Sequence, residues 1–282
     1  MGLIENLKSY SEEIQMSDYK KRLLESFLSN GFPTTKDEEW KYTSLKKVID
    51  NEYRIENKGQ VVDNSVIEKY SLGFESQIIC LDGKLINTPT IKGVNISGFS
   101  EFESNTNDSI LDLNKSLSQN GFTISIDKNT VVESPIEILF ISTTKTNFSQ
   151  YRNLISIAEN AEVKFVERIQ NLYNSPSFVN NFTQINCDKN TKIEYNKIQN
   201  NTSESQLIDT VNVYQEQDST CNINTLLFGG SFTRNNLNFE QNGFNCESNM
   251  SGVSLLDNNQ LADNHTYVDH KSANCRLSLI HI

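Results

Sequence analysis

The sequence predicts a mainly β protein, a parallel β-helix (β-solenoid) preceded by a small N-terminal α-helical region. From Gly121 to Arg276, short runs of β-branched and aromatic residues follow one another, separated by Asn, Asp, Ser and Gly. Almost nothing in this stretch has the periodicity of a long helix. The candidate strands are Phe122–Ile126, Ile136–Ile141, Leu154–Ile157, Val163–Val166, Phe178–Cys187, Lys192–Gln199, Leu207–Tyr214, Asn222–Phe228 and Asn236–Glu240.

A repeated unit favours a coil over a sandwich. A polar turn followed by a strand recurs, and the first residues of the turns are 30, 29 and 23 positions apart. The four copies are Asn160–Val163, Asn190–Ile193, Ser219–Asn222 and Asn242–Asn245. A unit of this length cannot bury a core alone, so it must stack on its neighbours. A β-sandwich is the alternative, but it needs tight hairpin turns, and only Asn242–Gly243 and Gly229–Gly230 have that composition.

Residues 1–50 are predicted to be helical. Leu3 and Leu7 begin an apolar pattern with the spacing of an amphipathic helix. A second helix is expected to begin after Ser17, which is a good N-cap residue. It should end at Gly31, because glycine readily adopts the left-handed conformation at the C-terminal end of a helix.

A third helix is expected to begin at Thr35–Glu38, which has the composition of a capping box, and to continue through Val48. This helix would carry Trp40, the only tryptophan of the chain. A single tryptophan usually anchors a core. We therefore expect Trp40 to be buried against apolar side chains of the first helices, such as Leu24 or Phe27.

The region between the helices and the β-helix is expected to be mixed. Ile78–Leu81 is a candidate strand, followed by a tight turn at Asp82–Gly83 into Lys84–Ile86. Ile110–Leu117 is a candidate short helix. The predicted division is a helical region at 1–50, a hairpin and linker region at 51–118, a β-helix core at 119–276 and a tail at 277–282.

Composition excludes several classes of function. The net charge is −11 and the chain has no basic stripe, so we expect no nucleic-acid partner. No apolar run approaches the roughly 20 residues of a membrane span, so we expect no membrane association. The first residues lack the basic and apolar segments of a signal peptide, which predicts a cytoplasmic protein.

The cysteines are few and scattered. Their number is odd, none belongs to a C-x-x-C pair, and the chain shows no secretion signal, which together predict reduced thiols. Each thiol is expected to pack as a small buried hydrophobe. The five positions are Cys80, Cys187, Cys221, Cys246 and Cys275.

Two strings carry a resemblance to a known family. The contiguous string Gly31–Thr43 resembles the N-terminal signature of the SufD branch of the SufB/SufD family, which belongs to the SUF system of iron–sulfur cluster assembly. The stretch Phe228–His270 resembles the core of the same family. The residues that carry the resemblance are Gly31, Pro33, Trp40, Tyr42, Gly229, Gly230, Arg234, Asp263, His265, Asp269 and His270.

The resemblance implies a right-handed parallel β-helix and a non-catalytic scaffold subunit. In the family, this subunit pairs with SufB, β-helix against β-helix, and recruits the ATPase SufC through C-terminal helices. Family members continue beyond Arg276 with further coils, whereas this chain has only residues 277–282, which we expect to form a tail. An iron–sulfur cluster would then be present transiently at the level of the complex, and none would be held stably by this chain.

One segment has the composition of a metal site. On a strand, Asp263, His265 and Asp269 would share a face while His270 points to the other face. Two carboxylates and an imidazole could bind a divalent metal ion. Alternatively, these side chains form hydrogen bonds at a corner of the coil or at a subunit interface.

The sequence contains no motif of an enzyme with its own turnover. The phosphate-binding, dinucleotide-binding, nucleophile-elbow and zinc-protease patterns are all missing from it. The alternative function is a β-helix carbohydrate-active enzyme or adhesin, which predicts a secretion signal and paired acidic residues in an aromatic groove. The string Gly31–Thr43 favours the scaffold subunit.

Overall fold

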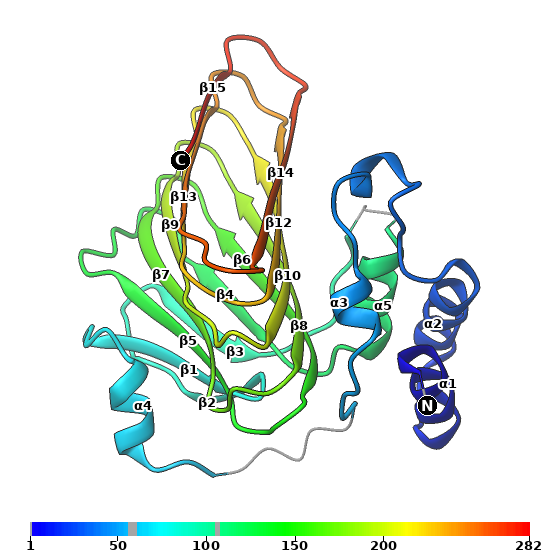
Figure 1. Cartoon of the computed structure of the whole chain (residues 1–282). Helices are drawn as coiled ribbons and strands as arrows, with labels where there is room; N and C mark the ends of the chain where they lie inside the picture. The colour runs from blue at the N-terminus through cyan, green and yellow to red at the C-terminus, as the bar shows by residue number, and fades with distance from the viewer. Residues whose placement is uncertain (1, 56–60, 105–107) are drawn as a thin grey trace.

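The computed structural model describes residues 2–55, 61–104 and 108–282, and it shows a coil of two stacked sheets (Figure 1). Odd-numbered strands form one sheet in the order β15-β13-β11-β9-β7-β5-β1-β2, and the order in the other sheet is β14-β12-β10-β8-β6-β4-β3. Successive strands therefore alternate between the sheets, and strands within a sheet pair in parallel from β4 onward. This is the predicted β-solenoid.

The strands match most of the predicted runs. The hairpin β1–β2 is antiparallel as expected, whereas β3, which pairs antiparallel with β4, had no sequence signal. The bounds are β1 (Ser76–Leu81), β2 (Lys84–Asn87), β3 (Val94–Gly98), β4 (Phe122–Ile126), β5 (Ile136–Ser142), β6 (Phe148–Ile157), β7 (Glu162–Asn171), β8 (Ser177–Cys187), β9 (Lys192–Gln199), β10 (Ser205–Gln215), β11 (Thr220–Leu227), β12 (Phe232–Gln241), β13 (Glu247–Ser254), β14 (Leu261–His270) and β15 (Arg276–His281).

One corner of the coil is a column of residues in the left-handed conformation. These residues are Asn129, Asn160, Asn190, Asp218, Asn245 and Asn274, with φ between 55 and 63°. Their amides form part of a ladder: Asn190 Nδ2 donates to Asn160 Oδ1 at 2.8 Å. Asparagine and aspartate tolerate this conformation better than most residues. Two of the four predicted turns were misplaced. The turn predicted at Ser219 has its left-handed residue at Asp218, one residue earlier, and the turn predicted at Asn242 has it at Asn245, three residues later.

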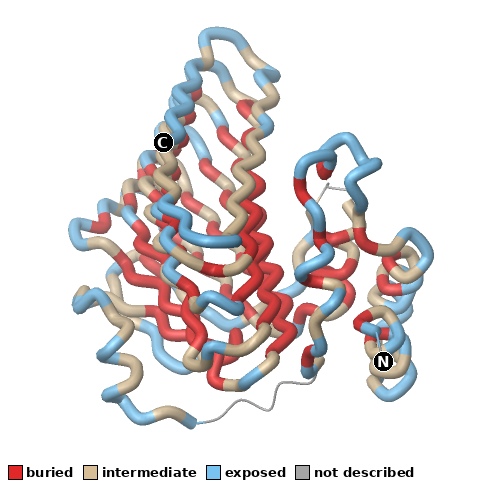
Figure 2. The backbone as a smooth tube through the Cα atoms, viewed as in Figure 1, coloured by how far each residue is buried: buried red, intermediate tan, exposed pale blue. Residues whose placement is uncertain are grey.

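The residues that we expected to form a tail contribute to the coil. Arg276–His281 forms β15, which pairs in parallel with β13 from the Glu247–Arg276 pair onward. Arg276 N donates to Cys246 O at 2.8 Å, which continues the ladder of the coil. β15 is the edge strand of the described sheet, and all six of its residues are exposed (Figure 2).

Helices α1, α2, α3 and α5 lie on the outer side of the sheet that contains β6, β8, β10 and β12, whereas α4 lies beside the other sheet (Figure 1). As predicted, Ser17 caps α2 by accepting from Lys20 N at 3.3 Å, and Gly31 ends α2 with φ 74°. The bounds are α1 (Leu3–Glu13), α2 (Asp18–Asn30), η1 (Glu38–Trp40, a 3₁₀ turn), α3 (Lys46–Ile49), α4 (Asn64–Tyr70) and α5 (Ser109–Leu117).

The predicted third helix was wrong. Thr34 donates from both its backbone N and its hydroxyl to Asp37 Oδ2, at 2.6 and 3.1 Å, and this local turn replaces the expected capping box. A single 3₁₀ turn follows, and of the predicted third helix only Lys46–Val48 is α-helical, within α3. The break lets the Trp40 side chain reach the core instead of following a helix face.

Trp40 is buried as predicted, with 5% of its surface exposed. It belongs to the same apolar cluster as Leu24 and Phe27, which also includes Phe178 and Phe232 from the outer face of the sheet. Tertiary packing therefore holds the N-terminal helices on the β-helix. A second apolar cluster fills the interior between the two sheets.

Candidate functional site

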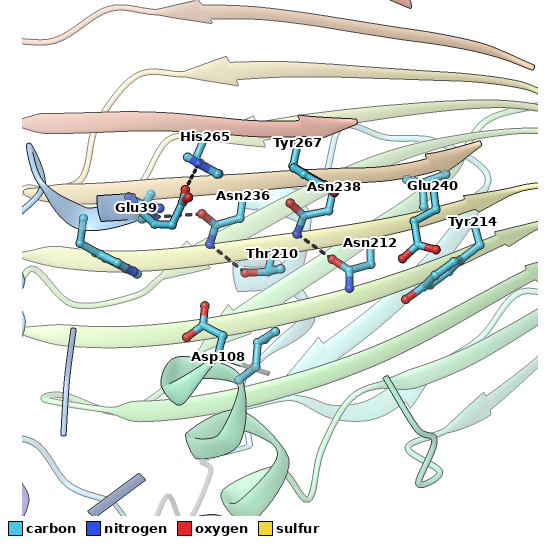
Figure 3. Close-up of a pocket in the computed structure, with 14 residues that line it drawn as sticks. Glu39, Asp108, Thr210, Asn212, Tyr214, Asn236, Asn238, Glu240, His265 and Tyr267 are labelled. Carbon is cyan, nitrogen blue, oxygen red and sulfur yellow. Dashed lines mark hydrogen bonds and ion pairs between the residues drawn. The ribbon is translucent and has the colours of Figure 1, made fainter. Parts of the chain in front are cut away.

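A crevice of about 280 Å³ lies where the N-terminal region meets the β-helix (Figure 3). Glu39 and Trp40 form one wall, and Asp108 and Leu111, at the start of α5, contribute another. The floor is the outer face of β10, β12 and β14. Side chains two residues apart on a strand share a face, so the register of the coils decides which of them meet.

Parallel register stacks the floor into columns. Thr210, Asn236 and His265 stand in register in one column, with Asn236 between the other two. Asn236 Nδ2 donates to Thr210 Oγ1 at 3.1 Å (Figure 3). In the next column, Asn238 Nδ2 donates to Asn212 Oδ1 at 2.9 Å. These amides partner one another along the axis of the coil, as expected for identical positions in consecutive coils.

Arg234 lies on the floor of the crevice, on β12, and is 3% exposed. Its guanidinium lies 3.9 Å from the centroid of the Trp40 ring. Nε donates to Asn236 Oδ1 at 2.9 Å, and Nη1 donates to the Asp263 carboxylate, which also accepts from the Thr43 hydroxyl. A stacked, doubly paired guanidinium suits arginine and not lysine.

His265 makes the second link to the N-terminal region. Its Nε2 faces the carboxylate of Glu39 across the crevice (Figure 3). Both side chains are partly exposed, with 35% and 65% of their surface accessible. An ion pair in this position is screened by water, so it orients the two segments more than it stabilises them.

Two further groups of the crevice have perturbed acidity. Burial raises the pKa of Asp108, whose carboxylate also accepts from Ile110 N at 2.8 Å and so caps α5. Burial also raises the pKa of Tyr214, and the neighbouring Glu240 carboxylate adds to the shift. Both changes favour the neutral forms of these side chains.

The predicted metal ligands are not gathered at one point. Asp263 pairs with Arg234, and Asp269 lies 3.9 Å from Lys271 Nζ. Asp263 and Asp269 are six residues apart on a strand, roughly 20 Å at about 3.3 Å per residue. Among the described residues, no group of three or more His, Cys, Asp or Glu side chains could hold a metal ion. Asp263 and His265 instead contact Arg234 and Glu39 of the same chain.

The other signature residues have separate roles or positions. Gly229 has φ 152°, and a Cβ atom there would lie 2.5 Å from Asn201 O, so the turn requires glycine. Gly230 also has positive φ, at 79°. Tyr42 is 87% exposed, and His270 is exposed at the end of β14. These two side chains contribute nothing to the crevice.

Sequence reasoning missed a charged group inside the coil. Lys197 Nζ lies 2.8 Å from Glu167 and 2.9 Å from Asp209, and all three side chains are at most 2% exposed. Burial raises the pKa of Glu167; burial alone would lower that of Lys197, but the carboxylates of Asp209 and Glu167 raise it. The available signal was a charge at an inward position of a strand, two residues after a buried aromatic such as Phe165 or Tyr195.

Comparison with known proteins identifies the family of this structure. Residues 140–281 match the family model "SUF system FeS cluster assembly, SufBD core domain", and residues 4–76 match "SufBD protein N-terminal region". The chain belongs to the SufB/SufD family. The core match covers β6 to β15, and the N-terminal match includes η1, which carries Trp40. The contact between Trp40 and Arg234 therefore joins the two family regions.

Two curated relatives are similar over most of the chain. The "Iron-sulfur cluster assembly protein SufD" of Escherichia coli is 22% identical over 96% of this chain, which spans 67% of that protein. The "Iron-sulfur cluster assembly SufBD family protein slr0076" of Synechocystis is 20% identical over 84% of this chain, which spans 59% of that protein. No helix in the described part of the chain has the length and apolar character needed to cross a membrane.

Proposed function

We propose that this chain is a SufD-like scaffold subunit in iron–sulfur cluster assembly. The observation that carries the proposal is the match of 96% of the chain to a SufD protein, together with the SufBD core family model over 140–281. The carbohydrate-active or adhesin alternative finds no support in these comparisons. We propose that this chain acts in the cytoplasm.

The site geometry supports a subunit without its own turnover. Two of the charged groups that line the crevice are held in ion pairs: Arg234 binds Asp263, and His265 binds Glu39. These pairs join β12 and β14 to the N-terminal region. Such contacts fix the relative position of two parts of the molecule, which is what a scaffold requires.

The proposed partners are a SufB-type protein, which would pair with this β-helix, and a SufC-type ATPase. The SufB contact is proposed to be β-helix against β-helix. The SufC contact is proposed to need the C-terminal helices found in other family members.

A cluster is proposed to form at the level of the complex, with none held stably by this chain. A cubane or rhombic cluster usually needs about four converging thiolates. Four of the five cysteines are buried, and they lie in different parts of the coil. Cys221 adjoins Cys187, whereas Cys246 adjoins Cys275. Two thiols at one place leave a cluster short of ligands.

Co-purification tests the proposal. The chain would be co-expressed with an affinity-tagged SufB-type protein, with and without a SufC-type ATPase, and iron and sulfide would be counted on the purified complex after anaerobic reconstitution. We expect the chain to be retained by the tagged SufB-type protein. We also expect the isolated chain to lose iron on desalting. Failure of the tagged protein to retain the chain, or a cluster that survives desalting on the chain alone, would contradict the scaffold function.

A further inference from the structure

Cys246 and Cys275 occupy the same position in consecutive corners of the coil. Each follows a left-handed asparagine, Asn245 with φ 62° and Asn274 with φ 60°. Each also precedes the first residue of a strand, and these two strands, β13 and β15, pair in parallel. The two cysteines are therefore direct neighbours along the axis of the coil, although 28 residues separate them in the sequence.

Their sulfur atoms meet at one carbonyl group. Cys246 Sγ lies 3.1 Å from Gly243 O, and Cys275 Sγ lies 3.4 Å from the same oxygen. Neighbouring strands are about 4.8 Å apart. Disulfides join Cα atoms that are roughly 4.4 to 6.8 Å apart. The backbone therefore already has the separation that a disulfide between these residues requires.

The two thiols differ in accessibility. Cys246 is 1% exposed, whereas Cys275 is partly exposed. Burial raises the pKa of Cys246 to about 11, and the adjacent Cys275 thiol adds to this shift. Cys187 and Cys221 form the other adjacent pair, but both lie in the interior cluster between the sheets. Among the residues that the structure describes, the corner pair alone combines an accessible thiol with a neighbouring one.

We propose that Cys246 and Cys275 form an oxidisable dithiol site whose disulfide cross-links consecutive coils of the β-helix. The oxidant is a low-molecular-weight disulfide. The Cys275 thiolate attacks one sulfur of this reagent, which forms a mixed disulfide and releases one thiolate. The Cys246 sulfur then attacks Cys275 Sγ and displaces the second thiolate. The two cysteine thiols lose two electrons and two protons, and the reagent is reduced to two thiols.

The cross-link would close a loop that contains all of β13 and β14. Closing such a loop restricts the unfolded chain, which stabilises the folded state. It would also tie β15, which has a neighbour on one side only, to the preceding coil. The oxidised chain should therefore have a higher melting temperature, and β15 should exchange its amide hydrogens more slowly than in the reduced chain.

Peptide mapping tests the site on the unaltered chain. Reduced, folded protein would be treated with oxidised glutathione, free thiols would be blocked with N-ethylmaleimide, and digested peptides would be identified by mass spectrometry. We expect a cross-linked peptide that contains Cys246 and Cys275 and has lost two hydrogens. Cys187 and Cys221 should be alkylated only after unfolding, which makes them the internal control.

Variants separate the two chemical steps. Cys246→Ser should stop the reaction at the glutathione adduct on Cys275, whereas Cys275→Ser should give neither adduct nor cross-link on the folded chain. Recovery of Cys246 and Cys275 as separate alkylated peptides from the oxidised wild-type chain would overturn the proposal. So would a Cys187–Cys221 cross-link that forms first, or a stable glutathione adduct on wild-type Cys275. Loss of SufB-type binding would not affect this measurement, so the two proposals fail independently.

Discussion

The guanidinium of Arg234 stacks on the ring of Trp40, 3.9 Å from the ring centroid, although 193 residues separate them in the sequence. This contact joins the two strings that carry the family resemblance. Asp263 completes it, because its carboxylate accepts from both Arg234 and Thr43. A cation over an aromatic face is worth up to about 2 kcal/mol when it is desolvated. The contact thus couples the N-terminal region to the β-helix.

Trp40→Ala should strongly destabilise the packing of the N-terminal region against the β-helix. Removing a buried aromatic side chain from a core typically costs about 3–5 kcal/mol of unfolding free energy. Urea denaturation followed by circular dichroism would measure the loss. Tyr42→Ala is the matched control, because Tyr42 is 87% exposed and exposed positions usually change stability by less than about 0.5 kcal/mol. Equal effects of the two substitutions would show that Trp40 does not anchor the N-terminal region.

Lys197→Met should destabilise the interior of the coil. The substitution leaves the carboxylates of Glu167 and Asp209 buried without their cation. Breaking a buried ion pair in this way typically costs about 3–5 kcal/mol. The triple variant Glu167→Gln, Lys197→Met, Asp209→Asn removes all three charges and should recover much of that loss. Thermal unfolding of the two variants would decide, and a triple variant less stable than Lys197→Met would contradict this explanation.

Stability should fall above the ordinary tyrosine pKa of 10.0. Burial raises the pKa values of Tyr53, Tyr151 and Tyr195 above that value in the folded state. Below pH 10 both the folded and the unfolded chain keep these protons, so the three tyrosines do not reduce the unfolding free energy there. Above it the unfolded chain loses protons that the folded chain retains, and each such proton lowers the unfolding free energy by about 1.4 kcal/mol per pH unit.

Tyr53→Phe tests this alkaline dependence. The Tyr53 hydroxyl lies 2.8 Å from Gln206 Oε1 in a buried contact. Between about pH 10 and 12, the unfolding free energy of the variant should fall less steeply than that of the wild type, because one fewer tyrosine proton is released on unfolding. Tyr42→Phe, which removes an exposed hydroxyl, is the matched surface variant. The explanation fails if both variants keep the wild-type slope.

Asn190→Ala should destabilise the corner column more than Asn190→Gly. Asn190 has φ 55°, and the left-handed conformation costs a residue with a Cβ atom roughly 1–2 kcal/mol. Both variants lose the hydrogen bond from Asn190 Nδ2 to Asn160 Oδ1, so their difference isolates the backbone conformation. Chemical denaturation would measure it. Equal stability of the two variants would mean that the corner does not require the left-handed conformation.

The local part of this fold could be predicted from the sequence. Strand alternation, the Ser17 cap and the left-handed Gly31 are set by neighbours a few residues away, and the structure agrees with them. The burial of Trp40 also followed, because a single large aromatic side chain rarely remains outside a core. The resemblance in Gly31–Thr43 and Phe228–His270 identified the family before any contact was known.

The contacts between coils were decided only by the tertiary structure. The turns vary in length, so the left-handed corners recur every 27 to 31 residues, and small errors in locating a corner change which side chains stack. The cysteines therefore look scattered in the sequence, whereas the register of β13 and β15 places Cys246 beside Cys275. Likewise, Thr34 and Asp37 ended the expected third helix through a side-chain contact that helical periodicity does not contain. Periodicity is a property of one strand or helix, whereas register depends on every turn between two coils.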